Sequence, residues 1–229
     1  MRAASRAVAL MLFCFLSRVY AEGSLPPQIE FAPPSGKGRA LVLVSGHSGT
    51  GNYEYYAKDL AEKSYYVVLV DGKDLWKKNG KELLRGVITR AQQSPHALPG
   101  KVAVIGFSLG GGVSLSFAAR MPELVSAVVV SYPMTSYIKD AGVFVSKIKV
   151  PTLMFAGVHD TYKDCCLIDT ARKLAAAAKV AGDKAMLEVV EFPYAEHGWT
   201  IKGMRAYRYD DTQEGFRRTL EFLGRNSGA

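Results

Sequence analysis

The sequence has 229 residues, of which 48% are hydrophobic and 22% charged, so one α/β domain with a continuous core fits and wholesale disorder is excluded. The formal net charge is +8, but the basic residues are scattered and form no run interleaved with aromatic residues. A nucleic-acid-binding protein is therefore not expected.

The first 21 residues have the pattern of a secretory signal peptide. Arg2 and Arg6 form a basic start, an apolar stretch follows, and Val19 and Ala21 occupy the −3 and −1 positions of a cleavage site. Arg18 ends the apolar stretch well short of the roughly 20 residues that a membrane span needs. We therefore expect cleavage after Ala21, export to the periplasm or the medium, and no stable membrane insertion.

The rest of the chain alternates strand-like and helical patterns. A Pro- and Gly-rich extended segment runs from Leu25 to Gly38. Apolar runs predict strands at 40–45, 64–71, 101–107, 124–131, 151–157 and 186–192. Helical spacing predicts helices at 53–63, 81–93, 109–120, 167–181 and 212–224.

The apolar runs are continuous rather than alternating, which is typical of strands buried on both faces. The sequence therefore predicts a single α/β domain over residues 22–229, with a mostly parallel central sheet and helices on both faces. The one sizeable insertion, 132–149, is too short for a lid domain. We expect an open, shallow site.

The junction 106–110 reads GFSLG, a Gly-x-Ser-x-Gly pattern between a predicted strand and a predicted helix. A strand that turns at once into a helix strains its corner residue, and side chains two positions away on either side would collide. Glycines at 106 and 110 remove these clashes, so the Ser108 hydroxyl would project above the sheet as a nucleophile. The pattern alone is weak, because glycine-rich turns also bind phosphate or simply pack.

A serine nucleophile needs a base, and the base needs a carboxylate to orient it. Asp160 and His197 each follow a predicted strand, as Ser108 does. Because the carboxyl ends of parallel strands meet at one edge of the sheet, we expect these three side chains to form a catalytic triad. His197 would act as the base and Asp160 would orient it.

Rival assignments exist for the base and for the carboxylate. His159 and His47 also lie just after predicted strands and compete with His197 as the base. Asp160, like Asp164, could instead cap the helix that follows. The order Ser, Asp, His along the chain, each just past an apolar run, favours the triad.

The oxyanion hole and the substrate contacts are less sharply defined by the sequence. One oxyanion donor should be the Leu109 N–H, and the second should come from His47 or Ser48, between which the sequence does not decide. Three aromatic residues near strand ends are predicted to flank the substrate, although aromatic residues there more often pack: Tyr132, Trp199 and Tyr53.

The cysteines suggest neither a disulfide nor a metal site. Cys14 lies in the predicted signal peptide, and Cys165 and Cys166 are neighbours. Consecutive Cα atoms lie about 3.8 Å apart, below the usual range for a disulfide, so free or partly buried thiols are favoured. Four spaced Cys or His ligands cannot be assembled, and we expect no metal and no cofactor.

Two other functions compete with hydrolysis. Residues 46–51 have the GxxxxG spacing of a phosphate-binding loop, but Asn52 and Tyr53 stand where Lys and Ser or Thr are needed. Nucleotide binding is therefore disfavoured. A non-catalytic protein that binds small molecules on the same fold is the main alternative.

The segments GFSLGGG, VPTLMFAGVHDTYKDCC and FPYAEHGW resemble the dienelactone hydrolase family, and the likeness extends from about residue 38 to the closing helix. The resemblance implies an α/β-hydrolase fold, with Ser108 as nucleophile, Asp160 as acid and His197 as base. The nucleophile of that family is often cysteine, so serine favours a more general esterase acting on small-molecule esters or lactones. The export signal also departs from the well-known members, which act inside the cell.

Overall fold

The structure is a computed structural model that describes residues 24–226, so the predicted signal peptide lies outside the described residues and export stays a prediction. The described chain forms a sheet in the order β1-β3-β2-β4-β5-β6-β7. The strands are β1 (Gln28–Phe31), β2 (Gly38–Val44), β3 (Tyr65–Val70), β4 (Ala97–Phe107), β5 (Val125–Ser131), β6 (Thr152–Gly157) and β7 (Leu187–Phe192). β1 pairs antiparallel with β3, and the other strand pairs are parallel.

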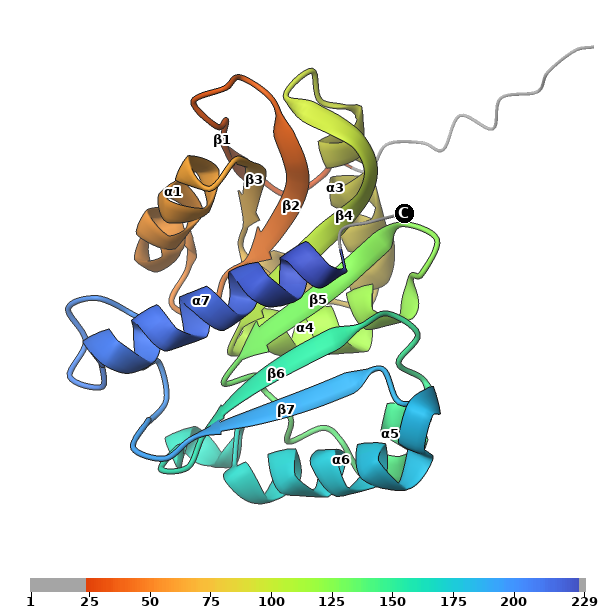
Figure 1. Cartoon of the computed structure of the whole chain (residues 1–229), viewed down its shortest axis with the longest axis vertical. Helices are drawn as coiled ribbons and strands as arrows, with labels where there is room; N and C mark the ends of the chain where they lie inside the picture. The colour runs from red at the N-terminus through yellow and green to blue at the C-terminus, as the bar shows by residue number, and fades with distance from the viewer. Residues whose placement is uncertain (1–23, 227–229) are drawn as a thin grey trace, which may run out of the picture.

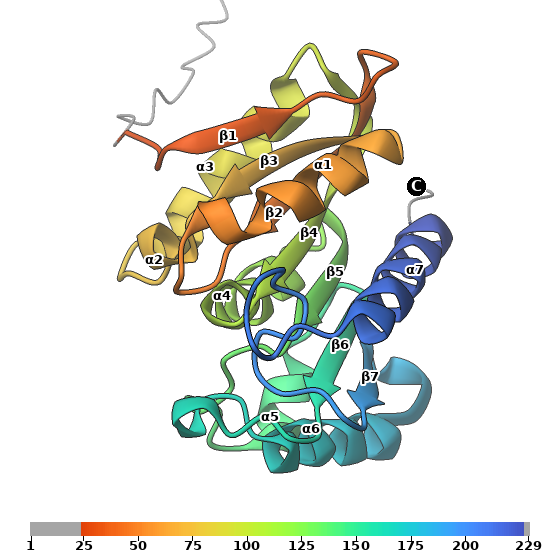
Figure 2. The same ribbon diagram turned by 90° about the vertical axis from the view of Figure 1, so that its left-hand side faces the viewer.

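Helices cover both faces of the sheet, as Figures 1 and 2 show. One face carries α1 (Glu54–Glu62) and α7 (Tyr209–Arg225). The other face carries α2 (Gly72–Leu75), α3 (Gly80–Gln93), α4 (Leu109–Ser116), α5 (Ala141–Ser146) and α6 (Ile168–Ala181). Among the described residues, no helix is both long enough and apolar enough to cross a membrane.

The strands are buried on both faces because their side chains alternate between two apolar layers. In β2, Val42 and Val44 face the layer that contains α3, whereas Leu41 and Leu43 face the layer that contains α1. All four side chains are fully buried. At about 1.5–3 kcal/mol for each fully buried Val or Leu side chain, this central strand anchors both layers.

The predicted fold class is confirmed: the sheet is mostly parallel, helices lie on both faces, and no large lid is present in the described chain. The insertion 132–149 holds only the short helix α5. Three of these elements were not predicted: α5, β1 and α2. β1 lies inside the segment expected to be merely extended, and the four-residue helix α2 begins behind Asp71, whose carboxylate accepts the Lys73 N–H.

A hydrogen bond between side chains joins the edge strand β1 to the sheet. The Tyr66 hydroxyl donates to the Glu30 carboxylate at 2.6 Å. Burial, followed by the bond to Glu30, raises the pKa of Tyr66 to about 12, so the hydroxyl stays protonated at neutral pH.

We expect Tyr66→Phe to lower the free energy of unfolding by about 1 kcal/mol, because it removes this hydrogen bond. Urea titration followed by circular dichroism measures the change, with Tyr65→Phe as the matched control. Since the pKa is raised in the folded state, the tyrosine's contribution is complete below pH 10 and is lost as the pH rises toward 12. Equal losses in both variants would contradict the role of the bond.

Candidate active site

Ser108 occupies the sharp turn between β4 and α4. Its backbone has φ 49° and ψ −114°, a conformation that side-chain-bearing residues rarely adopt. A Cβ at Gly110 would lie 2.3 Å from the Val44 carbonyl oxygen, and one at Gly106 would lie 2.4 Å from the Gly110 carbonyl oxygen. Only glycine therefore fits at these two positions, which is the reason for the Gly-x-Ser-x-Gly spacing.

The structure brings the three residues of the predicted triad together. The Ser108 Oγ lies 2.9 Å from His197 Nε2, and His197 Nδ1 lies 2.8 Å from Asp160 Oδ2. An ionised carboxylate only accepts hydrogen bonds, so Nδ1 carries the proton and Nε2 is free to accept from the serine. This is the geometry that a nucleophile, a base and an orienting carboxylate require.

Burial differs along this chain of hydrogen bonds. The Asp160 side chain is fully buried, while the His197 side chain keeps 15% of its surface exposed. The second Asp160 oxygen accepts the Tyr162 N–H at 3.1 Å. The carboxylate is therefore held from two sides, and solvent reaches the histidine but not the acid.

An aromatic side chain that the sequence analysis did not single out covers His197. The Tyr162 ring stacks on the imidazole with centroids 4.5 Å apart and planes at 10°. Its neighbours Lys163 and Asp164 both have positive φ, so the segment turns back sharply after Asp160. The position of Tyr162, two residues after Asp160, could have indicated that it lies at the site. An exposed tyrosine in a loop has no distinctive sequence pattern, so it was not singled out.

The rival histidines lie elsewhere. His159 and His47 are exposed, and neither forms a side-chain hydrogen bond with Ser108 or Asp160 in the described chain. The His159 backbone N–H donates to the Ala195 carbonyl, which fixes the loop.

The predicted oxyanion donors lie on two segments, the start of α4 and the turn after β2. Leu109 is the first residue of α4, so its N–H has no acceptor within the helix. His47 and Ser48 lie in the turn after β2, and both are exposed. The assignment of the second donor to His47 or Ser48 stays a prediction.

The three aromatic residues predicted to flank the substrate lie in the core beneath the site. Tyr53, Tyr132 and Trp199 each expose at most 1% of their surface. The Tyr132 ring lies 5.0 Å from the His197 ring, and Trp199 packs against Phe192. Burial raises the pKa of Tyr53, whose hydroxyl bonds to Tyr132 and Ser48. These three rings are therefore part of the core that packs against the site.

The expectation of free thiols at Cys165 and Cys166 is wrong. The two neighbouring residues form a disulfide bond although their Cα atoms lie only 3.8 Å apart. The distance rule describes cysteines brought together by folding, and it does not exclude a bond within one dipeptide. The two sulfur atoms lie within 4.8 Å of a His197 ring nitrogen, so the disulfide borders the candidate site.

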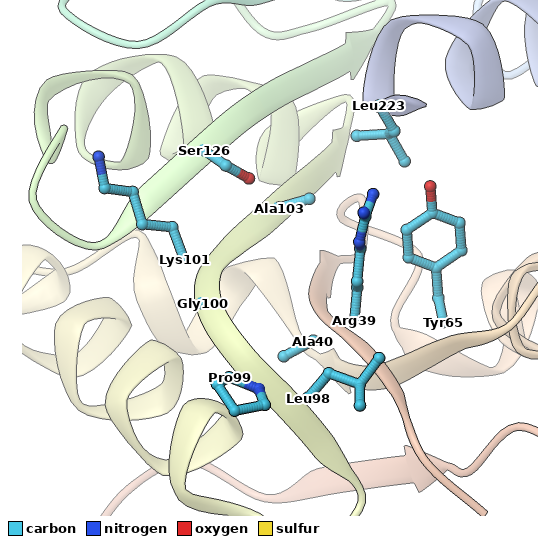
Figure 3. Close-up of a pocket in the computed structure, with 10 residues that line it drawn as sticks. All are labelled: Arg39, Ala40, Tyr65, Leu98, Pro99, Gly100, Lys101, Ala103, Ser126 and Leu223. Carbon is cyan, nitrogen blue, oxygen red and sulfur yellow. The ribbon is translucent and has the colours of Figure 1, made fainter. Parts of the chain in front are cut away.

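One hollow of the described chain lies away from Ser108, at the opposite end of the strands. It has a volume of about 320 Å³ and lies at the amino ends of the strands, where Arg39, Tyr65 and Lys101 line it (Figure 3). The triad residues instead follow the carboxyl ends of the strands. None of them lines this hollow, and the open, shallow site expected from the sequence stays a prediction.

Comparisons with solved structures bear on the fold. A putative dienelactone hydrolase from Klebsiella pneumoniae is 16% identical with a TM-score of 0.69, over 86% of this chain and 99% of that one. Esterase 2 from Thermogutta terrifontis, phosphoramylated by tabun, is 18% identical with a TM-score of 0.66, over 86% and 88%. A dienelactone hydrolase-like promiscuous phosphotriesterase from metagenomic libraries is 15% identical with a TM-score of 0.67, over 86% and 88%.

At such identities these likenesses show the fold alone. No curated protein matches the chain. The sequence profile of the dienelactone hydrolase family matches residues 49–227, which include Ser108, Asp160 and His197. The chain therefore belongs to the dienelactone hydrolase family.

Proposed function

We propose that this protein hydrolyses small carboxylic esters or lactones through an acyl-enzyme formed on Ser108. Membership of the dienelactone hydrolase family supports a carboxylic ester hydrolase. The observation that carries the mechanism is the continuous relay from the serine through His197 to Asp160, with both hydrogen bonds below 3.0 Å.

In the first half of the reaction, the Ser108 oxygen attacks the substrate carbonyl while His197 Nε2 takes the serine proton. The Asp160 carboxylate stabilises the resulting imidazolium. The Leu109 N–H and a donor from the turn after β2 stabilise the oxyanion. His197 then gives the proton to the leaving alkoxide, and the acyl group remains on the serine.

In the second half, water attacks the acyl carbonyl while His197 takes its proton. Collapse of the second tetrahedral intermediate returns the proton to Ser108 and releases the acid. The 15% exposure of the His197 side chain allows water to approach without a lid opening. A lactone follows the same steps, except that its alcohol and acid leave as one molecule.

A fluorophosphonate probe tests the nucleophile directly. Attack by the Ser108 oxygen forms an O–P bond and expels fluoride, and His197 takes the proton. We expect one label per chain on the peptide that contains Ser108, with hydrolysis of p-nitrophenyl butyrate lost in proportion to labelling. Intact-mass and peptide mass spectrometry measure both, and heat-denatured protein serves as the control.

The outcome separates the two candidate functions. The Thermogutta esterase, which shares this fold, is described as phosphoramylated by tabun, so an organophosphorus probe is an apt choice. If the folded protein is neither labelled by the probe nor able to hydrolyse the ester, a non-catalytic binding protein is the better function. Labelling on a different residue would overturn the assignment of Ser108.

A further inference from the structure

We propose that Cys165 and Cys166, when their disulfide is reduced, form with His197 a binding site for a thiophilic divalent metal ion such as Zn²⁺. Cysteine thiolates and a neutral imidazole are the ligands that zinc prefers in proteins. The site exists only in the dithiol form, because the sulfur atoms of a disulfide are not thiolates.

The three ligand atoms are already close together. One ring nitrogen of His197 and the two sulfur atoms lie within 4.8 Å of one another. With Zn–S near 2.3 Å and Zn–N near 2.0 Å, tetrahedral ligand atoms lie roughly 3.5–3.8 Å apart. The limit of 4.8 Å exceeds this spacing by only about 1 Å, so we expect side-chain rotations after reduction to complete the site.

The backbone holds the cysteines near His197 without help from the disulfide. The Cys165 carbonyl oxygen accepts the Thr135 N–H at 2.7 Å and the Ser136 N–H at 3.0 Å. The Met134 N–H in turn donates to the Ser108 carbonyl at 2.8 Å. This segment after β5 therefore ties the cysteine pair to the turn that carries Ser108, through backbone bonds that do not involve the sulfur atoms.

An external thiol or phosphine supplies the electrons that reduce the disulfide between Cys165 and Cys166. Reduction adds two electrons and two protons, breaks the S–S bond and gives two thiols, while the reductant is oxidised. The thiols then lose two protons as one divalent ion binds, and the neutral imidazole donates a lone pair. Three protein ligands leave the fourth position of a tetrahedral ion to water.

Metal binding would also stop hydrolysis, and this part rests on the proposed function. Nε2 is the atom that accepts the serine proton, and Nδ1 is the atom that Asp160 orients. A metal on either nitrogen breaks the relay. The disulfide would therefore protect the base from metal ions, and reduction would expose it to them.

Co²⁺ provides a spectroscopic test that does not depend on activity. The described cysteines are reduced with tris(carboxyethyl)phosphine, the reductant is removed without air, and Co²⁺ is titrated into the full protein. We expect one ion per chain with the intense visible bands of a tetrahedral thiolate site. The oxidised protein should bind at least about 100-fold more weakly. Zn²⁺ should displace Co²⁺ and abolish ester hydrolysis. A chelator should remove the Zn²⁺ and restore hydrolysis.

Matched variants assign the ligands. The double variant Cys165→Ser/Cys166→Ser should lose the thiolate bands, and His197→Gln should weaken binding at least about 10-fold. His159→Gln, an exposed histidine outside the cluster, should bind as the wild type does. Circular dichroism confirms that each variant folds.

Absence of Co²⁺ binding to the reduced wild type would overturn the proposal, as would equal affinity in His197→Gln. The thiolate bands report binding even if no ester is hydrolysed. A failure of the proposed function is therefore distinguishable from a failure of the metal site.

Discussion

Ser108→Ala should lower kcat for p-nitrophenyl acetate by about 10⁶-fold, to the rate that binding and the oxyanion donors alone supply. The variant removes the atom that would form the acyl-enzyme in the proposed mechanism, and it leaves His197 and Asp160 hydrogen-bonded to each other. Because alanine replaces a side chain that is 7% exposed, it creates no large cavity. The fold should therefore be unchanged by circular dichroism.

Initial rates with purified wild type and variant measure this loss. Ser146→Ala is the matched control, because Ser146 is an exposed serine of α5 remote from the relay. Its rate should equal that of the wild type. Equal rates in Ser108→Ala and the wild type would make Ser108 a packing residue and would leave the binding protein as the better function.

His197→Gln should be nearly as damaging, with kcat lowered by about 10⁶-fold, since a glutamine amide cannot accept the serine proton and return it. The neighbouring histidine tests whether this loss is specific. His159 is exposed and is fixed by its backbone bond to Ala195, so His159→Gln should keep activity within about twofold.

Initial rates of p-nitrophenyl acetate hydrolysis by His197→Gln, His159→Gln and the wild type measure this difference. The reverse pattern, with activity lost in His159→Gln and kept in His197→Gln, would move the base to His159 and break the assignment.

Much of this architecture is encoded in local patterns. Continuous apolar runs such as 101–107 predict strands buried on both faces, and the alternation with helices predicts the parallel sheet. The positions of Ser108, Asp160 and His197 just after such runs predict their convergence, because parallel strands end at one edge. Their hydrogen-bonded geometry follows from topology more than from any property of the three residues.

Features without periodicity were not predicted. β1 is four residues long and lies among prolines, and its pairing with β3 depends on a partner about 40 residues away. The disulfide at Cys165 and Cys166 depends on a local turn that the distance rule overlooks. Stacking of Tyr162 on His197 joins two loops, and no local pattern encodes such a contact.

The backbone conformation at Ser108 lowers the stability of the fold at the position of the proposed nucleophile. A residue with a side chain at φ 49° and ψ −114° costs about 1–3 kcal/mol, which glycine there would largely avoid. A chain optimised for stability alone would therefore carry glycine at 108 and would lack the hydroxyl that the proposed mechanism needs. Serine at this position therefore lowers the thermal stability of the domain, and it places a hydroxyl within 2.9 Å of His197 Nε2.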